Sequence, residues 1–291
     1  PQDPRDRLRA EFAFSRLAWD HGVRRLPQPL AADRARRLGL YEFVEGRKLA
    51  PGEVGADAVS QALAFVEEVN RDKAAADSGI VASEACFTLG GHLATVTRRL
   101  GRLDGIDADS PAHIQACRFV EAELRPCWRA VERQVLEAAG RLGLDPDEPL
   151  AEADRCLSPS DFGFHNAIVP DQGVIRFIDF EYAGWDDPAK LVCDFFNQIA
   201  VPVPRGHYPA FADAVAAGLS RPDLHRRRFD LLMPVYTVKW ATIALNDFLP
   251  VGASRRRFAL GEADASARLQ AQLDKARRCL TSLGEAAHAG H

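Results

Sequence analysis

The sequence predicts an α+β protein in which a small β-containing front part precedes a large, mainly helical body with one embedded β-hairpin. Two patterns in its 291 residues lead to this prediction. Apolar residues recur at helical spacing over most of the chain after about residue 56. Runs with strand character are confined to two short stretches near the start and to a pair of stretches in the middle.

The front part is expected to contain one helix and two strands. Residues 4–21 carry apolar side chains at helical spacing, and His21-Gly22 ends the pattern. The stretches 26–32 and 38–44 have strand character, and the second runs into Gly46 and a linker near residues 44–52.

Helices and one hairpin account for the body. Apolar stripes predict helices from about residue 56, around residues 86–100 and over residues 112–142, with an interruption at Pro126. Four further helices are expected at residues 187–198, 208–219, 222–249 and 262–287. Strands at residues 167–170 and 174–180 flank Pro170-Asp171-Gln172-Gly173, which has the residue types of a hairpin turn.

Composition excludes several classes of protein. The net charge of -4 provides no basic surface for nucleic acid. No run of 18 apolar residues occurs, so no membrane span is expected. None of the six cysteines lies at CxxC spacing, which argues against a zinc ribbon and favours reduced thiols in a cytoplasmic protein.

The central segment, SPSDFGFHNAIVPDQGVIRFIDFE, gathers oxygen-bearing side chains. Asn166 leads directly into the first strand of the predicted hairpin, and Asp179 stands at the end of the second. Because a tight hairpin places these two ends side by side, Asn166 and Asp179 should be neighbours. Asp161 lies on the loop just before them, so two carboxylates and a carboxamide are expected to converge.

This set of side chains suits phosphoryl transfer. Mg²⁺ prefers oxygen ligands and keeps several waters, so one carboxylate, one amide oxygen and phosphate oxygens can hold it. The second carboxylate can position and deprotonate an attacking hydroxyl. Taken singly, each residue also has a structural interpretation: Asp161 as a turn cap, Asn166 as a turn residue and Asp179 as a solvent-facing strand end.

The pattern D-x-x-x-x-N, a hairpin and then D resembles the catalytic core of protein kinases and of the aminoglycoside/choline kinase-like phosphotransferase family. Asn166 follows Asp161 by 5 residues and Asp179 follows Asn166 by 13, as in protein kinases. The text FIDFEYAGWDDPAKLVCDF is more similar to aminoglycoside phosphotransferases, with Asp179 and Glu181 in their D-x-E/D motif. The resemblance implies a protein kinase-like fold.

The resemblance also implies roles for these residues. Asp161 matches the catalytic base, so the Asp-Phe-Gly at 161–163 is not the metal motif that its letters suggest. Asn166 and Asp179 match the metal ligands, with Glu181 as a possible aid.

The front of the chain is expected to bind nucleotide. The stretch LYEFVEG resembles the hinge between two lobes, where backbone groups of Glu42 and Val44 would bond to adenine; an ordinary strand and turn is the alternative. Glu11 resembles the helix glutamate that pairs with a phosphate-gripping lysine, although it could be a surface residue paired with Arg7.

Asp187, Asp194 and His165 are expected to support the site. Gly184, Asp187, Pro188 and Asp194 match a G-x-x-D-P-x-x-D-like stretch of the family, with the last spacing stretched. Asp187 precedes Pro188 and is better explained as a helix N-cap. Asp194 could brace the catalytic loop or face the substrate. His165 is expected to support the loop rather than transfer a proton.

The sequence departs from the family pattern in two places. Pro159 stands where the family has a histidine two residues before the base. No glycine-rich hairpin and no lysine precede Glu11, and the first lysine is Lys48. Either these parts lie upstream of Pro1, as a missing initial methionine favours, or the protein grips nucleotide less fully.

We therefore expect a small-molecule kinase that transfers the γ-phosphoryl group of ATP or GTP to a hydroxyl with Mg²⁺. Residues 1–46 would form a partial amino-terminal lobe that ends in the hinge, and residues 47–291 a helical carboxy-terminal lobe. The acceptor would be an aminoglycoside, amino alcohol or sugar, without nucleic acid or membrane partners. A weakly active or inactive nucleotide-binding protein is the alternative; a metal-dependent hydrolase is disfavoured because the histidines are scattered.

Overall fold

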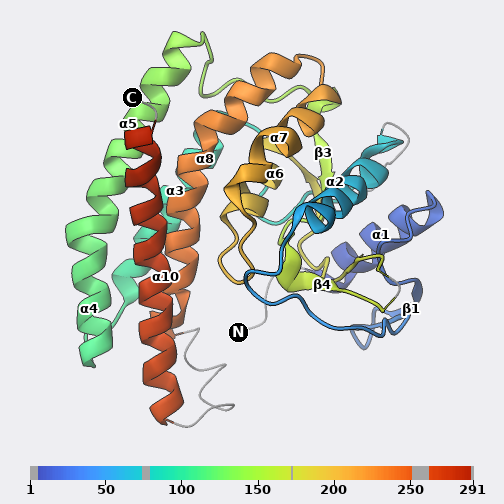
Figure 1. The fold of residues 1–291 in the computed structure, drawn as a ribbon, viewed down its shortest axis with the longest axis horizontal. Helices are drawn as coiled ribbons and strands as arrows, with labels where there is room; N and C mark the ends of the chain where they lie inside the picture. Colours follow the sequence, from blue (N-terminus) through green and yellow to red (C-terminus); the bar gives the residue numbers. More distant parts are fainter. Residues whose placement is uncertain (1–5, 74–78, 172, 251–261, 290–291) are drawn as a thin grey trace. The chain divides into compact units, whose positions relative to one another are not determined.

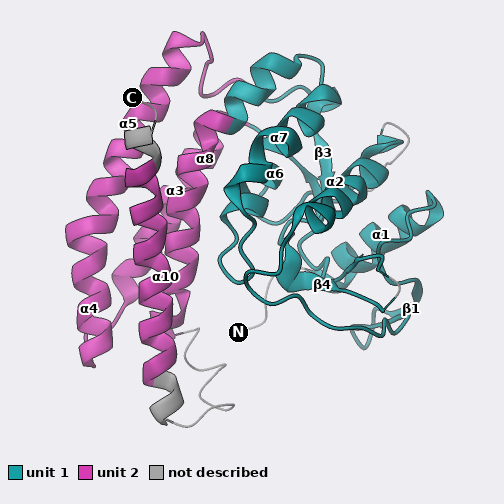
Figure 2. Cartoon of the chain, in the orientation of Figure 1, with its two compact units in different colours: residues 1–87, 149–229 teal, residues 88–148, 230–291 magenta. Residues whose placement is uncertain are grey.

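The structure, a computed structural model, describes residues 6–73, 79–171, 173–250 and 262–289. Its contacts divide the chain into two compact units, which Figure 2 shows in two colours. The first unit comprises residues 1–87 and 149–229, and the second comprises residues 88–148 and 230–291. The two units are defined by contacts within the chain and are not the two predicted lobes. The predicted lobe boundary at residue 46 stays a prediction.

The first unit begins with a helix on a small ribbon. Helix α1 (Arg7–Asp20) starts at Asp6, whose side chain accepts a hydrogen bond from the N–H of Arg9 (3.0 Å). It packs against the antiparallel strands β1 (Pro29–Asp33) and β2 (Leu38–Tyr41), as Figure 1 shows. Helix α2 (Ala56–Asn70) follows and packs against strand β3 (Cys156–Ser158) and helix α7 (Tyr208–Ala217).

Two more two-stranded sheets carry the middle of the chain. Strand β3 (Cys156–Ser158) pairs antiparallel with β6 (Gly184–Asp186). Strand β4 (Ala167–Ile168) pairs antiparallel with β5 (Arg176–Phe177). Gly184 has φ +157° and backs onto residues 80–82 so closely that a Cβ there would lie 2.6 Å from the carbonyl of Ile80, which explains the glycine.

Helices complete both units. In the first, α6 (Pro188–Asn197) packs on α7 (Tyr208–Ala217), and α8 (Pro222–Ala244) begins. The second holds α3 (Leu89–Arg102), α4 (Pro111–Phe119), α5 (Arg125–Arg141), the end of α8 and α10 (Glu262–Ala289). A π-helical segment, Val120–Leu124, separates α4 from α5 and stands just before the predicted interruption at Pro126.

The α+β prediction with a small β-containing front and a helical body is confirmed, but the strands differ in detail. The hairpin is shorter than expected: β5 ends at Phe177, so Asp179 lies two residues beyond it. The pairing of β3 with β6 was missed, because strands of three residues show no periodicity. Residues 4 and 5 of the predicted first helix and Gln172 of the predicted turn lie outside the described residues.

The described residues can be compared with the predictions on membrane spans and on cysteines. None of its helices combines the length and hydropathy that a bilayer crossing requires. All six cysteines belong to this part and are free thiols, and four of them are buried.

An aromatic cluster supports the middle of the first unit. The ring of Phe65 on α2 is fully buried and stacks on Phe177 of β5, with centroids 4.9 Å apart. Phe162 and Phe180, which flank the strands, lie 5.8 Å and 5.9 Å from the same ring. One side chain of α2 therefore holds the loop before β4 and the segment after β5 together.

We expect Phe65→Ala to lower the free energy of unfolding by about 3–5 kcal/mol, because it removes a buried ring and leaves a cavity. Urea unfolding followed by circular dichroism measures this loss. Phe43→Ala is the matched control, since Phe43 is 88% exposed and should change stability by less than about 0.5 kcal/mol. Equal effects of the two substitutions would contradict a central role for the Phe65 cluster.

Candidate active site

The loop between β3 and β4 is fastened by its own side chains. The amide nitrogen of Asn166 donates a hydrogen bond to the backbone carbonyl of Asp161 (3.1 Å). The Nε2 atom of His165 lies 3.4 Å from Oδ1 of Asp161. Both contacts span the turn Phe164–Asn166 and hold Asp161 from the side of the following strand.

The short ribbon brings Asp179 to this loop. The N–H of Ile178 donates to the carbonyl of Asn166 (2.9 Å), which extends the pairing one step beyond β5. Asp179 then turns away with φ +68°, a left-handed conformation that residues other than glycine seldom adopt. Asp161, Asn166 and Asp179 line one small pocket as a result. Its other lining residues are Pro159, Phe162, Phe177, Ile178 and Phe180.

Negative charge is concentrated beside this pocket. Partial burial, together with the charges of Glu181 and Asp161, raises the pKa of Asp179. Burial raises the pKa of Glu11 on α1 to about 7; the charge of Asp179 adds to this, while the N–H of Phe180 donates to Glu11 and opposes it. His165 and Arg7 act on the pKa of Asp179 in the opposite direction and only partly offset the increase. An additional cation would therefore be bound favourably here.

The donor set fits a magnesium ion that also binds phosphate. The amide nitrogen of Asn166 is used on the Asp161 carbonyl, which leaves the amide oxygen for a ligand. Asp179 offers a carboxylate to the same pocket. Among the described residues, no three His, Cys, Asp or Glu side chains form a metal site by themselves. Mg²⁺ commonly takes one or two protein oxygens and completes its shell with water and substrate phosphates.

Comparison with protein families identifies the chain. The model of the phosphotransferase enzyme family matches residues 1–229. The chain belongs to this family. No curated protein matches this phosphotransferase at a significant level. The predictions of the family and of a phosphotransferase enzyme are therefore confirmed.

Solved structures support the kinase-like fold of this phosphotransferase. A choline/ethanolamine kinase family protein from Mesorhizobium loti is 16% identical with a TM-score of 0.57, over 96% of this chain and 80% of that one. An ethanolamine kinase from Plasmodium vivax is 14% identical with a TM-score of 0.51, over 94% and 72%. A spectinomycin phosphotransferase bound to ADP and spectinomycin is 11% identical with a TM-score of 0.52, over 93% and 82%. At these identities the likeness concerns the fold.

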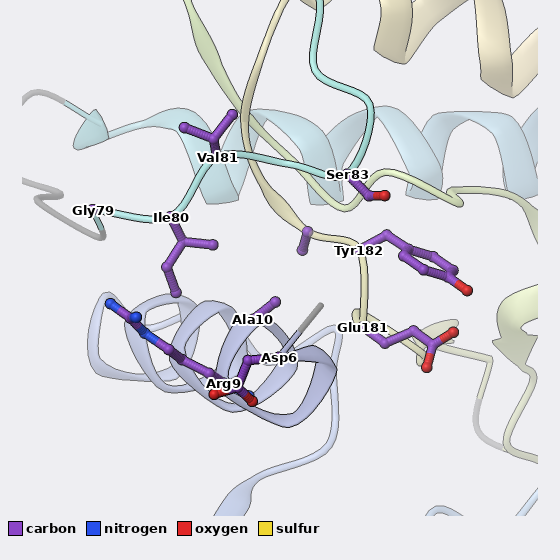
Figure 3. Close-up of a pocket in the computed structure, with 10 residues that line it drawn as sticks. Asp6, Arg9, Ala10, Gly79, Ile80, Val81, Ser83, Glu181 and Tyr182 are labelled. Atoms are coloured by element: carbon purple, nitrogen blue, oxygen red, sulfur yellow. The ribbon is translucent and has the colours of Figure 1, made fainter. Parts of the chain in front are cut away.

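Glu181 is turned toward α1 in this phosphotransferase. Its Oε1 atom lies 2.6 Å from Nη1 of Arg7, and the side chains of Arg7 and Glu181 are 30% and 24% exposed. Glu181 also lines a second, open pocket together with Tyr182, and Figure 3 shows Asp6 and Arg9 of α1 among the other residues that line it. The metal-binding role of Glu181 stays a prediction, since it would require Glu181 to exchange its arginine partner for the ion.

The predicted hinge follows β2. The N–H of Glu42 donates to the carbonyl of Gln28 (2.9 Å), and its carboxylate accepts from the N–H of Gln28 (3.0 Å). The binding of adenine by backbone groups of Glu42 and Val44 stays a prediction. Gly46 packs closely on Val169, and two backbone hydrogen bonds of 2.8 Å and 3.0 Å join Arg47 to Val169. The hinge is thus fixed to the strand that follows Asn166.

The remaining predicted residues are Asp187, Asp194 and His165, of which Asp187 and Asp194 are buried. Asp187 is fully buried, caps α6 through the N–H of Ala189 (2.7 Å) and pairs with Arg228 (2.7 Å), in agreement with the predicted N-cap. Asp194 is buried on α6, where its charge acts on Lys190. His165 contacts Asp161, as the supporting role requires.

Sequence analysis missed three features near the site. Lys48, beyond the hinge, donates from Nζ to the carbonyl of His165 (3.5 Å). The hydroxyl of Tyr41 is buried without a hydrogen-bond partner among the described residues, and burial and the charge of Glu11 raise its pKa. Lys190 is buried next to the loop. A lysine in the apolar run PAKLVCDFF was a visible signal, but its partners were not.

We expect Glu11→Gln to stabilise the protein at about pH 8 and to have a much smaller effect at about pH 5. A carboxyl group whose pKa is raised by folding opposes folding increasingly as pH rises from about 4.5 to about 7. Glutamine removes the charge and keeps an oxygen for the Phe180 N–H. After allowance for the partly exposed carboxyl group, the gain at about pH 8 should be roughly 1–2 kcal/mol.

Thermal unfolding of both proteins across this pH range, with EDTA present, measures the difference. Glu67→Gln is the control, because Glu67 is an exposed residue of α2 and its loss should change stability little at any of these pH values. A gain from Glu11→Gln that does not depend on pH would contradict the crowding of negative charge around Glu11.

Proposed function

We propose that this phosphotransferase is a small-molecule kinase that transfers the γ-phosphoryl group of ATP or GTP to a hydroxyl group with Mg²⁺. The observation that carries the proposal is the single pocket lined by Asp161, Asn166 and Asp179. Phosphoryl transfer requires little covalent help from the protein, and it does require a base and an anchored metal in one place.

Asp161 is proposed as the catalytic base. The contacts from His165 and Asn166 hold it at the edge of the pocket. In this position a carboxylate can accept the proton of the acceptor hydroxyl and direct the oxygen toward the phosphorus atom. Base catalysis of this kind contributes about 10²–10⁴-fold to the rate.

Asn166 and Asp179 are proposed to hold the magnesium ion, with Glu181 as a further ligand if it releases Arg7. When bound, Mg²⁺ neutralises phosphate charge. Asn166 is suited to this task because the same side chain is anchored to the base, which fixes the distance between the metal ligand and Asp161.

The nucleotide is proposed to lie between the hinge and this pocket. The carbonyl of Glu42 and the N–H of Val44 would bond to adenine. Glu11 has no ion-pair partner among the described residues, and burial together with the charge of Asp179 raises its pKa. Glu11 is therefore the proposed partner of a cation that binds the phosphates.

The acceptor is proposed to be a small hydroxylated molecule such as an aminoglycoside, an amino alcohol or a sugar. Proteins of similar fold are named as a choline/ethanolamine kinase family protein and a spectinomycin phosphotransferase, which supports this range without selecting within it. A cytoplasmic location and a helical wall for the acceptor pocket stay predictions.

We expect Asp161→Asn to reduce nucleotide consumption by at least about 10²-fold and to leave nucleotide affinity unchanged. Asparagine keeps the size of the side chain but cannot take the hydroxyl proton. Coupled-assay turnover with a panel of hydroxylated acceptors, together with calorimetric titration of nucleotide, separates the two effects. If the variant turns over like the wild type, Asp161 is not the base.

We expect Asp179→Asn to weaken binding of Mg²⁺–nucleotide by about tenfold or more, because one anionic ligand is lost, and to change metal-free nucleotide binding little. Isothermal titration calorimetry with and without Mg²⁺ measures both. Asp171→Asn is the matched control, since Asp171 is an exposed residue of the hairpin turn. Equal affinities of wild type and Asp179→Asn for Mg²⁺–nucleotide would rule out the metal role.

The same assays decide between an enzyme and a nucleotide-binding protein without turnover. A wild-type protein that consumes no nucleotide with any acceptor, yet melts at a higher temperature with Mg²⁺–nucleotide, would support the second function. Pro159 is the observation that favours this alternative, because it removes a side chain that could support the base.

A further inference from the structure

Lys190 is a buried cation at the start of α6. Its side chain is only 3% exposed, and it forms an ion pair with Asp186, which is fully buried. Burial alone would lower the pKa of Lys190, but the charges of Asp186 and Asp194 outweigh it and raise the pKa. The ammonium group therefore stays protonated and acts as a hydrogen-bond donor rather than as a base.

Asp186 holds this ammonium in a fixed position. Its Oδ1 atom accepts hydrogen bonds from the N–H of Cys86 (3.2 Å) and of Asp187 (2.9 Å), and its Oδ2 atom accepts from Lys190. Both oxygens are thus engaged, and neither can rotate freely. A buried ion pair adds little net stability compared with apolar side chains of similar size, so stability alone does not explain why Lys190 and Asp186 are buried here.

The third contact of Lys190 leads to the candidate base. Its Nζ atom donates to Oγ of Ser160 (3.3 Å), the residue immediately before Asp161. Ser160 has φ +65°, a conformation that glycine adopts at lower cost. Its N–H also donates to Oγ of the buried Ser158 (3.1 Å). A serine at a position that favours glycine indicates that the hydroxyl group is needed.

We propose that Lys190 is a positioning residue for Asp161: fixed by Asp186, it holds the hydroxyl of Ser160 and so orients the carboxylate that follows. This inference rests on the proposed function of Asp161. Lys190 does not line the pocket and acts only through Ser160. It secures the loop on the side where Pro159 provides no donor, while His165 and Asn166 secure the other side.

Ser160→Ala and Ser160→Gly test the tether without disturbing the buried ion pair. Both should lower kcat roughly 10- to 100-fold, leave KM for nucleotide within about twofold and increase amide hydrogen exchange of residues 160–166. Glycine relieves the left-handed backbone, so a variant with wild-type kcat would show that the hydroxyl is not needed. Ser220→Ala is the control: it loses a hydrogen bond to the buried Asp154 (2.6 Å) but should keep kcat.

The double variant Lys190→Met with Asp186→Asn removes both charges, so no unpaired charge remains buried. It should lower kcat as Ser160→Ala does, and adding Ser160→Ala should cause no further loss, because both changes cut the same contact. Independent, multiplicative losses would overturn the proposal. If the wild type consumes no nucleotide, the proposed function fails, and unchanged exchange of residues 160–166 in Ser160→Ala would separately overturn the tether.

Discussion

The candidate site depends on one backbone hydrogen bond beyond the end of a very short ribbon. The N–H of Ile178 donates to the carbonyl of Asn166, and this contact sets Asp179 beside the amide. Two paired residues per strand cannot hold such a ribbon in water. The buried ring of Phe65 supplies what the ribbon lacks, because it packs on Phe177 and reaches the segments on either side. The packing of α2 therefore also determines where the carboxylates lie.

The same arrangement is costly without a ligand. Asp179 is surrounded by the charges of Asp161, Glu181 and Glu11, and both Asp179 and Ser160 adopt left-handed backbone conformations. Each such residue costs about 1–3 kcal/mol, which the surrounding structure must offset. A bound cation would relieve this crowding of negative charge and so offset part of the cost.

The sequence predicted those features that depend on residues close together in the chain. The helices followed from apolar periodicity, and the approach of Asn166 to Asp179 followed from turn residues between two strands. The pairing of β3 with β6 was not predictable, because it joins residues 156–158 to residues 184–186 without any periodic signal. Lys190 is a charge in an apolar run, but no sequence rule connects it to Ser160, 30 residues earlier. Partners across such separations arise only from the tertiary fold.

Pro159 has a different meaning once these long-range partners are known. In the sequence it removes a side-chain donor beside the base and so favours a weak or inactive protein. In the structure, support comes from both directions: Ser158 and Lys190 hold Ser160, and His165 and Asn166 hold Asp161. A proline also restricts the backbone of the loop by fixing its own φ angle. The contacts that the structure provides around the Asp161 carboxylate thus come from residues other than the one at position 159.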